Sequence, residues 1–278
     1  MEPVKIDLEE YVHSGEGANG ESFFHRTDPS IMLKLYNASA PLEIVLNELE
    51  LSRKVYEAGL PVPKPGDLVT DGTRTGIRFQ RIPGKISFSR AVGNDPGRVE
   101  EYARRFAALC LKFHSVHLDK DRFDDVKDVD RRLLVQNPFF TAEEKAKVAA
   151  FIDAAPDGDS PHHGDLQFSN AVMDADGNEY FIDLGDFACG HPYFDLGMVE
   201  VCCLHSDESF IMETFHMSKK TSSEFWRYFV KGYFGEDADF DAITLMLRPY
   251  AGLKTLVIER NFGVCFPHFH ALLDDILK

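Results

Sequence analysis

Outside residues 41–59, short apolar runs bounded by polar turns occupy much of the first 80 positions, and they predict a group of short strands. Glycine, proline and Asp-Gly turns separate the apolar runs, as expected for strands that pair with their neighbours. Between Pro41 and Gly59 the apolar residues instead recur at helical spacing, which predicts one helix of about 17 residues. The expected strands cover residues 11–13, 22–25, 30–36, 67–70 and 75–82.

After residue 85 the pattern becomes helical. Apolar side chains between Gly97 and His117 recur every three or four positions, which is typical of a central buried helix. The change of pattern near residues 80–90 predicts two parts, residues 1–84 and 85–278, and an α+β fold class. Further helices are expected at residues 142–155, 195–206, 221–234, 239–260 and 268–277.

Composition is that of an ordinary globular protein, with 44% hydrophobic and 27% charged residues in a chain of 278. No apolar run approaches the roughly 20 residues of a membrane span, and the first residues lack the features of a signal peptide. We therefore expect a cytoplasmic protein without a membrane partner.

Net charge is −16, which argues against a nucleic-acid partner. The acidity is concentrated in the second part, because residues 1–90 carry a net charge of −2 and residues 91–278 a net charge of −14. This acidity forms either a solvated surface or the lining of a site for a cationic substrate.

The five cysteines form no C-x-x-C pair, so neither a disulfide framework nor a zinc site is indicated. Buried, reduced thiols are expected instead. The pair His268 and His270 resembles a metal-binding tract only superficially.

A glycine-rich turn near the start offers a place for phosphate. Gly15, Gly17 and Gly20 have the G-x-G-x-x-G spacing, which lets backbone N–H groups approach phosphate oxygens closely. The next segment is a strand and not a helix, which excludes a dinucleotide-binding βαβ unit. Two interpretations remain: a glycine loop over a β-hairpin, or a surface turn without a ligand.

Lys34 lies in that strand and requires an anionic partner. The expected partner is Glu48, which lies in a partly apolar row of the predicted helix.

Three polar side chains around a predicted hairpin offer oxygen ligands. Asp165 and Asn170 precede the hairpin and Asp183 follows it. If Asp176 and Gly177 are the two turn residues, residues 175 and 178 pair and Asn170 faces Asp183. Two oxygen donors beside a third carboxylate suit Mg2+, which shares the rest of its coordination shell with phosphate and water.

These features together indicate phosphoryl transfer, in which catalysis is mainly positioning and charge stabilisation. His163-Gly164-Asp165-Leu166 followed by Asn170 has the spacing of a kinase catalytic loop, with glycine in the arginine position. Asp183-Leu184-Gly185 then matches the metal-binding D-F-G with one substitution. Asp186 is the rival metal ligand, but Ala188 stands where its glycine is needed.

With these motifs in this order, the chain resembles the aminoglycoside phosphotransferase and choline kinase family. The resemblance also covers the turn Gly59-Leu60-Pro61-Val62-Pro63 and the later Asp195-Leu196. It implies a bilobal protein-kinase-like fold, a small N-terminal lobe with an antiparallel sheet and one helix, and a larger, mostly helical C-terminal lobe. It also implies ATP as cofactor, Asp165 as catalytic base and Asp195 as a brace of the catalytic loop. Adenine is expected at the backbone of Gln80, Arg81 and Ile82.

Several features narrow the activity. Glycine before Asp165 and a short segment after Gly185 favour a constitutive small-molecule kinase over a regulated protein kinase. The related fructosamine kinase branch typically has tryptophan where Gln167 stands here, which argues against that branch.

We therefore expect an ATP- and Mg2+-dependent kinase that phosphorylates a hydroxyl of a small molecule, with an amino sugar, aminoglycoside or amino alcohol favoured by the acidic second part. The alternatives are a catalytically silent nucleotide-binding regulatory module of the same fold, and a metal-dependent hydrolase that uses His162, His163 and Asp165. The residue pattern indicates neither the acceptor nor an oligomeric state.

Overall fold

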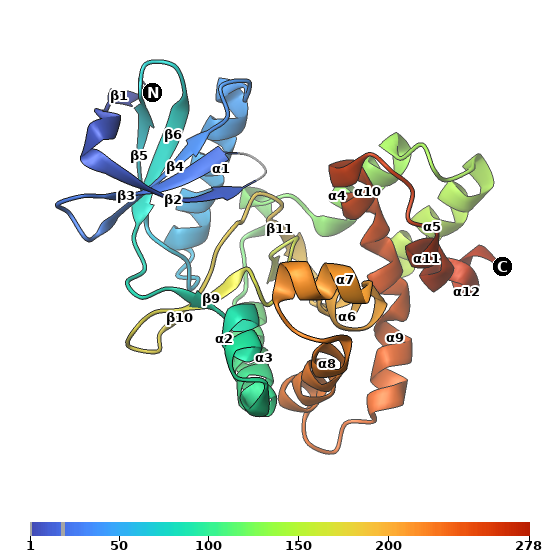
Figure 1. Ribbon diagram of the computed structural model, residues 1–278. Coiled ribbons are helices and arrows are strands. Elements are labelled where there is room, and N and C mark those ends of the chain that lie inside the picture. The colour runs from blue at the N-terminus through green and yellow to red at the C-terminus, as the bar shows by residue number, and fades with distance from the viewer. Residues whose placement is uncertain (1, 18–19) are drawn as a thin grey trace. The chain divides into compact units, whose positions relative to one another are not determined.

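The chain folds into two units in the computed structural model, which describes residues 2–17 and 20–278 (Figure 1). The first unit contains the residues up to Ile86 together with Val172–Gly185. The second contains Ser87–Ala171 and Asp186–Lys278. The hairpin that follows Asn170 therefore belongs to the first unit, although its sequence lies within the second part of the chain.

The first unit is built on a six-stranded sheet with the order β1-β5-β6-β4-β3-β2. Only the short β1 runs parallel to its neighbour, β5, and the other pairings are antiparallel. This is the antiparallel-rich sheet that the family resemblance implies for the first part of the chain. The strands are β1 Val4–Lys5, β2 Tyr11–Gly17, β3 Gly20–His25, β4 Ile31–Tyr36, β5 Pro65–Thr70 and β6 Thr75–Gln80.

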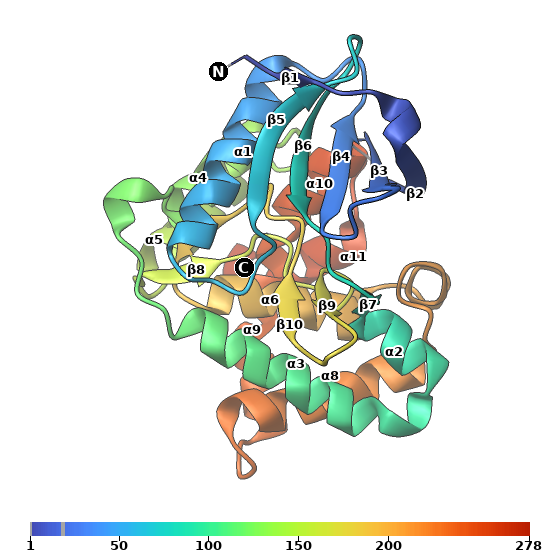
Figure 2. The same ribbon diagram turned by 90° about the vertical axis from the view of Figure 1, so that its left-hand side faces the viewer.

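One helix, α1 (Leu42–Glu57), packs on this sheet and runs along β5 in Figure 2. Its buried residues Val45 and Leu49 contact Leu68 and Ile77 of the sheet. Each such apolar side chain contributes about 1.5–3 kcal/mol when it leaves water, so this stripe fixes the helix against the strands. The helix ends before Gly59, whose φ of 78° suits a glycine after a helix terminus.

The hairpin of β9 (Ala171–Met173) and β10 (Glu179–Phe181) has a different turn from the predicted one. Asp174 N–H donates to the carbonyl oxygen of Asn178 at 2.9 Å, so three residues form the loop, and the predicted pairing of residue 175 with 178 is wrong. The Asp174 carboxylate accepts the N–H groups of Asp176 and Asn178, and Gly177 has a φ of 83°. An Asp side chain that caps the turn and a left-handed glycine stabilise the three-residue loop.

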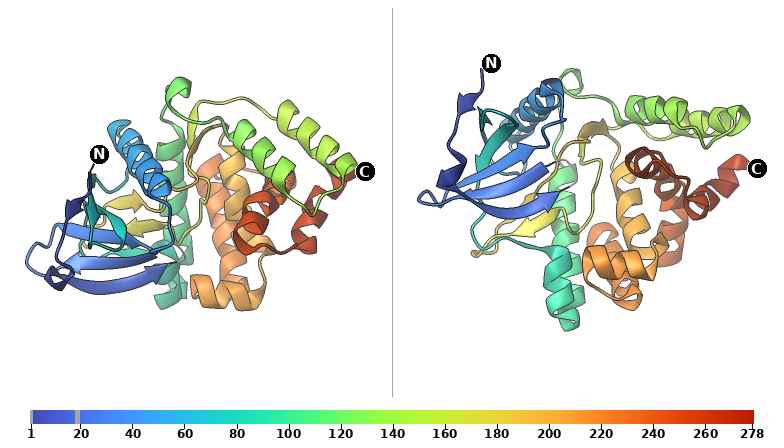
Figure 3. Two further views of the ribbon diagram at one scale, coloured as in Figure 1. Left: turned by 90° about the horizontal axis from the view of Figure 1, so that it is seen from above. Right: turned by 45° about the horizontal axis from the view of Figure 1, so that its top comes forward.

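The second unit is mostly helical. Its core lies between α3 (Val99–His114) and α8 (Lys219–Phe234), which lie side by side in Figures 1 and 3. Phe106 of α3 contacts both Phe225 and Phe229 of α8 through tilted rings. The other helices are α2 Phe88–Asn94, α4 Val126–Gln136, α5 Ala142–Ala154, α6 Tyr193–Glu200, α7 Glu208–Phe210, α9 Phe240–Leu253, α10 Thr255–Phe262, α11 Pro267–His270 and α12 Asp274–Leu277.

Short elements complete the fold. Strands β8 (Ser160–His162) and β11 (Ala188–Gly190) pair antiparallel in the second unit, and β7 (Ile86–Ser87) lies where the two units meet in sequence. Two π-helical turns, Val201–His205 and Ile211–Phe215, follow α6 and α7. The 3₁₀ segments are Leu8–Glu10, Pro96–Arg98, Lys120–Arg122 and Ala271–Leu273.

Several sequence expectations differ from the structure in detail. The helix predicted at 239–260 is divided into α9 and α10 at Lys254, whose N–H donates to Ala251 in a tighter turn. Helices α2 and α4 were not predicted. The expectation of buried thiols is wrong for Cys265, which is exposed, whereas the other four cysteines are buried. Within the described part of the chain, no helix is both long and apolar enough to cross a membrane.

Candidate active site

Lys34 in the first unit is paired as the sequence predicts. Residues alternate across β4, so Leu33 and Leu35 enter one apolar cluster while Tyr36 joins the cluster beneath α1. Lys34 shares the helix-facing side, where its Nζ lies 2.6 Å from Oε1 of Glu48 on α1. Both side chains are largely buried, with 23% and 14% exposed, so each compensates the other's loss of hydration.

Asp183 lies beside this pair. Its Oδ1 is 3.9 Å from Nζ of Lys34, and 60% of its side chain is exposed. The residue has a φ of 63°, a left-handed conformation that is uncommon for any residue except glycine. The preceding strand is fixed to the same unit, because Phe181 N–H donates to the carbonyl oxygen of Pro61 at 2.7 Å. Residues in such sparsely populated backbone conformations cluster at functional sites, which makes Asp183 a candidate.

The predicted glycine loop is described only in part. Gly15, Gly17 and Gly20 lie at the facing ends of β2 and β3, with Gly17 opposite Gly20, and residues 18–19 of the loop tip lie outside the described residues. A Cβ on Gly20 would lie 2.2 Å from the carbonyl oxygen of Leu35. Glycine at that position is thus required by the approach of β4, independently of any phosphate.

The segment expected to bind adenine follows β6. Gln80 N–H donates to the carbonyl oxygen of Lys64 at 2.8 Å, and Arg81 N–H donates to that of Ser30 at 2.7 Å. The Arg81 guanidinium lies over the ring of Phe24 at 3.9 Å. These two N–H groups therefore have partners within the unit, and adenine would have to use other backbone groups near Ile82.

Asp165 in the second unit has an oriented carboxylate. Its Oδ2 accepts hydrogen bonds from Nε2 of Gln167 and from Nδ2 of Asn170, each at 2.8 Å. The Ser169 hydroxyl in turn donates to Oε1 of Gln167 at 2.9 Å. The loop thus holds the carboxylate through two amide groups of its own residues.

The same arrangement orients the amide of Asn170. Its Nδ2 also donates to the carbonyl oxygen of Asp165 at 3.1 Å, so the amide oxygen is directed away from these two acceptors. An amide oxygen here and the exposed Asp183 carboxylate in the first unit are the donor types that Mg2+ prefers. The residues of each unit therefore fit the predicted cation.

Asp195 holds the loop before Asp165. Its buried carboxylate accepts His163 N–H at 2.7 Å and Gly164 N–H at 3.1 Å, which is the bracing role that the family resemblance implies. His114 of α3 approaches Oδ2 with its Nε2 at 3.3 Å, while its Nδ1 lies 2.8 Å from the Tyr233 hydroxyl. Burial opposes ionisation of Asp195, but the neighbouring histidines and Lys254 outweigh it and hold its pKa well below the usual range.

His162 lies on the other side of Asp195, with Nδ1 at 3.1 Å from Oδ1. Its Nδ1 lacks a hydrogen-bond partner among the described residues. Burial lowers the pKa of His162 to about 3, although the Asp195 carboxylate opposes this shift. The imidazole is therefore neutral at neutral pH, which makes it a packed structural group and not a cationic one.

Gly164 has a steric reason for being glycine. Its φ is 86°, and a Cβ would lie 2.2 Å from the carbonyl oxygen of Asp186. The Asp186 carboxylate is bound by the Arg260 guanidinium at 2.9 Å. Asp186, the rival metal ligand, thus pairs with an arginine of its own unit, whereas Asp183 lies beside Lys34.

The sequence model of the phosphotransferase enzyme family matches residues 14–223. The chain belongs to this family. No curated protein sequence matches it significantly.

Solved structures similar to this phosphotransferase are aminoglycoside phosphotransferases. A thermostable mutant of APH(4)-Ia in a ternary complex with ADP and hygromycin B has a TM-score of 0.63 at 14% identity, over 96% of this chain and 92% of that chain. ADP-bound APH(2'')-Ib has a TM-score of 0.57 at 16% identity, over 97% of this chain and 92% of that chain. The type VIII aminoglycoside-3'-phosphotransferase has a TM-score of 0.53 at 20% identity, over 87% of this chain and 93% of that chain. At these identities the likeness shows the shared fold.

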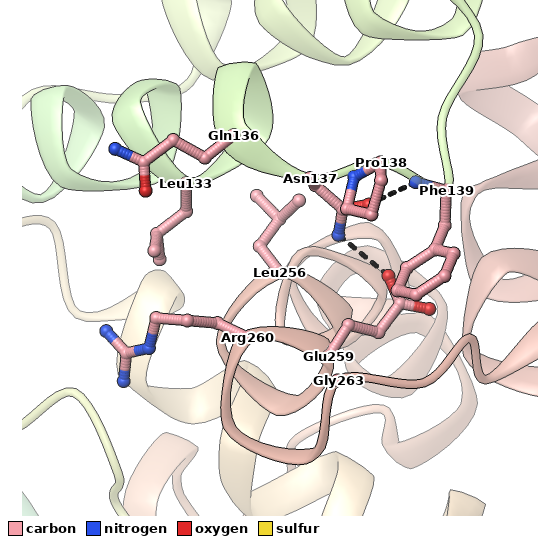
Figure 4. Close-up of a pocket in the computed structure, with 9 residues that line it drawn as sticks. All are labelled: Leu133, Gln136, Asn137, Pro138, Phe139, Leu256, Glu259, Arg260 and Gly263. Atoms are coloured by element: carbon pink, nitrogen blue, oxygen red, sulfur yellow. Dashed lines mark hydrogen bonds between the residues drawn. The ribbon is translucent and has the colours of Figure 1, made fainter.

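The second unit of the phosphotransferase contains a pocket of about 270 Å³ between the end of α4 and α10 (Figure 4). Leu133, Pro138, Phe139 and Leu256 supply apolar walls, and the carboxylate of Glu259 accepts Nδ2 of Asn137 at 2.7 Å. Arg260, which binds Asp186, also lines the pocket.

Sequence reasoning missed two groups of the phosphotransferase. Gln167 was noted only as a departure from a related branch, and Ser169 was not considered, although both lie within the same loop as Asp165. The contact of His114 with Asp195 joins residues 81 positions apart. Such contacts have no periodic signal in the sequence.

Acid should destabilise the second unit through His162. The pKa of His162 is about 3 in the folded chain and has the ordinary value of 6.5 in the unfolded chain. Between pH 3 and pH 6.5 the unfolded chain therefore binds a proton that the folded chain does not bind. The contribution of His162 to the free energy of unfolding should be constant above pH 6.5 and should decrease as the pH falls below 6.5. Urea unfolding of wild type and His162→Asn at several pH values measures the effect. The wild-type slope should exceed that of the variant by up to about 1.4 kcal/mol per pH unit, and equal slopes would contradict the assignment.

Proposed function

We propose that this protein transfers the terminal phosphate of ATP to a hydroxyl group of a small molecule. The observation that carries the proposal is the loop of the second unit, where Asp195 fixes the backbone and the amides of Gln167 and Asn170 orient the Asp165 carboxylate. A carboxylate held in this way is suited to accept the proton of an acceptor hydroxyl as that oxygen attacks phosphorus.

The first unit would bind the nucleotide. Lys34 is held by Glu48 and so presents an ammonium group, already partly desolvated, to phosphate oxygens. Backbone N–H groups of the loop at Gly15, Gly17 and Gly20 would contact the triphosphate. The segment Gln80–Ile82 would lie against adenine.

Mg2+ would be held by Asp183 of the first unit and Asn170 of the second. When bound, the ion neutralises charge on the phosphates. The Asp183 carboxylate lies 3.9 Å from the Lys34 ammonium group. Phosphate oxygens bound to Lys34 would therefore lie close to Asp183, which supports this role for Asp183.

For the acceptor we propose an aminoglycoside, an amino sugar or an amino alcohol. The net charge of −14 over residues 91–278 favours a cationic molecule. In the pocket between α4 and α10 the Glu259 carboxylate is already bonded to Asn137, Phe266 and His270, so the acidity of residues 91–278, and not this pocket, supports the cationic acceptor.

A screen of aminoglycosides and hydroxyl-bearing metabolites for ADP release tests the proposal. We expect acceptor-dependent ADP release that requires Mg2+, with a phosphorylated product detectable by mass spectrometry. Nucleotide binding without turnover of any acceptor would favour the silent regulatory module instead. The simultaneous presence of Lys34, Asp165, Asn170 and Asp183 counts against that alternative.

Asp165→Asn should abolish most of the phosphoryl transfer while Mg2+-ATP binding remains. General base catalysis typically contributes about 10²–10⁴ in rate, so kcat should fall by this factor. Asp237→Asn, at an exposed position of the same unit, is the matched control and should keep wild-type turnover. Unchanged turnover in Asp165→Asn would refute its role as base.

Asp183→Ala should lose metal-dependent nucleotide binding. Without this carboxylate the cation has one oxygen ligand fewer, so the thermal shift produced by ATP together with Mg2+ should approach that produced by ATP alone. Asp176→Ala, in the exposed loop of the same hairpin, is the control. A full Mg2+-dependent shift in Asp183→Ala would show that another residue holds the metal.

Gln167→Leu should reduce kcat by roughly tenfold and leave KM for ATP nearly unchanged, because the loss of one amide lets the Asp165 carboxylate rotate out of its reactive orientation. Ser169→Ala, which removes only the support of Gln167, should have a smaller effect in the same direction. If Gln167→Leu instead raises KM alone, Gln167 contacts substrate and does not position the base.

A further inference from the structure

The turn between α10 and α11 gathers a carboxylate, a thiol and an imidazole. Oε1 of Glu259 lies 2.8 Å from Nε2 of His270, and Sγ of Cys265 lies 3.9 Å from the same nitrogen. Each side chain offers one potential ligand atom, and these three atoms lie within 4.8 Å of one another. This cluster belongs entirely to the second unit and contains none of the residues proposed for phosphoryl transfer.

Local backbone geometry produces the cluster. Helix α10 ends at Phe262, and Gly263 reverses the chain with a φ of 68° while its N–H donates to the carbonyl oxygen of Glu259 at 2.8 Å. Pro267 then begins α11. The three residues thus lie within 12 positions of one another in the sequence. Glu259 lies in the last turn of α10, Cys265 in the connecting turn and His270 at the end of α11.

Two of the three side chains are held in place by neighbours. Asn137 donates to Oε2 of Glu259 at 2.7 Å, and Phe266 N–H donates to Oε1 at 2.8 Å. The imidazole of His270 stacks on the ring of Phe140 with the centroids 4.2 Å apart. Such surrounding contacts fix ligand orientation in metal sites and lower the cost of assembling them.

Access differs among the three groups. The Glu259 side chain is fully buried and that of His270 is 17% exposed, whereas Cys265 is exposed. A cation could therefore enter from the side of Cys265 and reach a carboxylate that water does not otherwise solvate. A buried carboxylate gains most from a cation, because its own hydration has been lost.

We propose that Glu259, Cys265 and His270 form a binding site for a divalent cation of the Zn2+ class. A sulfur, a nitrogen and an oxygen ligand suit this borderline-soft ion, whereas Mg2+ prefers oxygen ligands alone. The thiol must lose its proton on binding, so one proton passes to solvent for each ion bound. The fourth position of a tetrahedral ion is left for water or another ligand.

The site would also affect the neighbouring pocket. Glu259 lines that pocket, and its Oε2 bonds to Asn137 on the opposite wall (Figure 4). A cation on Oε1 would hold Glu259, and with it the turn after α10, against the α4–α5 connection. The ion is therefore expected to stiffen one side of the pocket.

The sequence did not indicate this site, because its ligands lack the C-x-x-C spacing. The histidine pair was judged superficial as a metal tract, and the structure places only His270, not His268, in the cluster. A second cluster, His13, Glu16 and Glu21 in the first unit, has no buried ligand and no thiol, so it suits this ion less well.

Titration of the full-length protein with Co2+, a spectroscopic substitute for Zn2+, tests the proposal. We expect one equivalent to give the intense near-ultraviolet band of a cobalt–thiolate bond, and Zn2+ to abolish that band by displacement. Cys265→Ser should lose the band and bind at least about tenfold more weakly, and Asn137→Ala should weaken binding by about 10- to 100-fold. Calorimetry in buffers of different ionisation enthalpy should show release of one proton.

His268→Asn and His13→Asn are the controls, and both should bind as wild type does. The proposal is overturned if wild type gives no thiolate band, if Cys265→Ser binds Zn2+ as tightly as wild type, or if His13→Asn abolishes binding. Cys265 is exposed, so its replacement by serine should leave the fold intact, and circular dichroism checks this. These measurements do not use phosphotransfer activity, so they stand or fall independently of the proposed function.

Discussion

The Asp195 carboxylate is the contact on which the candidate site of the second unit depends. It accepts the N–H groups of His163 and Gly164, the two residues before Asp165, and it is completely buried. Hydrogen bonds to a charged group contribute about 1.5–3 kcal/mol each, so two of them fix the loop backbone firmly. The cost of burying this charge is offset by these two hydrogen bonds and by His114, which in turn connects the loop to Tyr233 of α8.

A second buried charge organises the first unit. The pair of Lys34 and Glu48 joins β4 to α1, and the hairpin carries Asp183 to the same ammonium group. In both units, then, a charged side chain that is expensive to bury is held by a partner from a distant part of the sequence. In each unit the group for which we propose a chemical role lies next to such a charged side chain: Asp183 lies near Lys34, and Asp165 follows the two residues bound by Asp195.

Close backbone approach explains residues that sequence motifs alone leave ambiguous. Gly164 stands where protein kinases have arginine, and the carbonyl oxygen of Asp186 leaves no room for a Cβ there. Gly20 belongs to a phosphate-loop pattern, yet the approach of Leu35 would require glycine in any case. A glycine in a motif can therefore serve the packing of the chain as well as the chemistry of a ligand.

The sequence by itself determined the fold class, the helix and the sheet strands of the first unit other than β1, the pairing of Lys34 with Glu48 and the order of the motif residues, because periodicity and spacing are local signals. Tertiary structure decided the rest. With the Asp174 side chain capping the turn, Gly177 is the last residue of a three-residue loop and not the second of a two-residue turn, so the register argument failed. Asp183 lies beside Lys34 and Asp186 pairs with Arg260, and these contacts support our proposal that Asp183 is the metal ligand. Gln167 and the cluster of Glu259, Cys265 and His270 became visible only in three dimensions, because side-chain direction and helix reversal bring together groups that no sequence period relates.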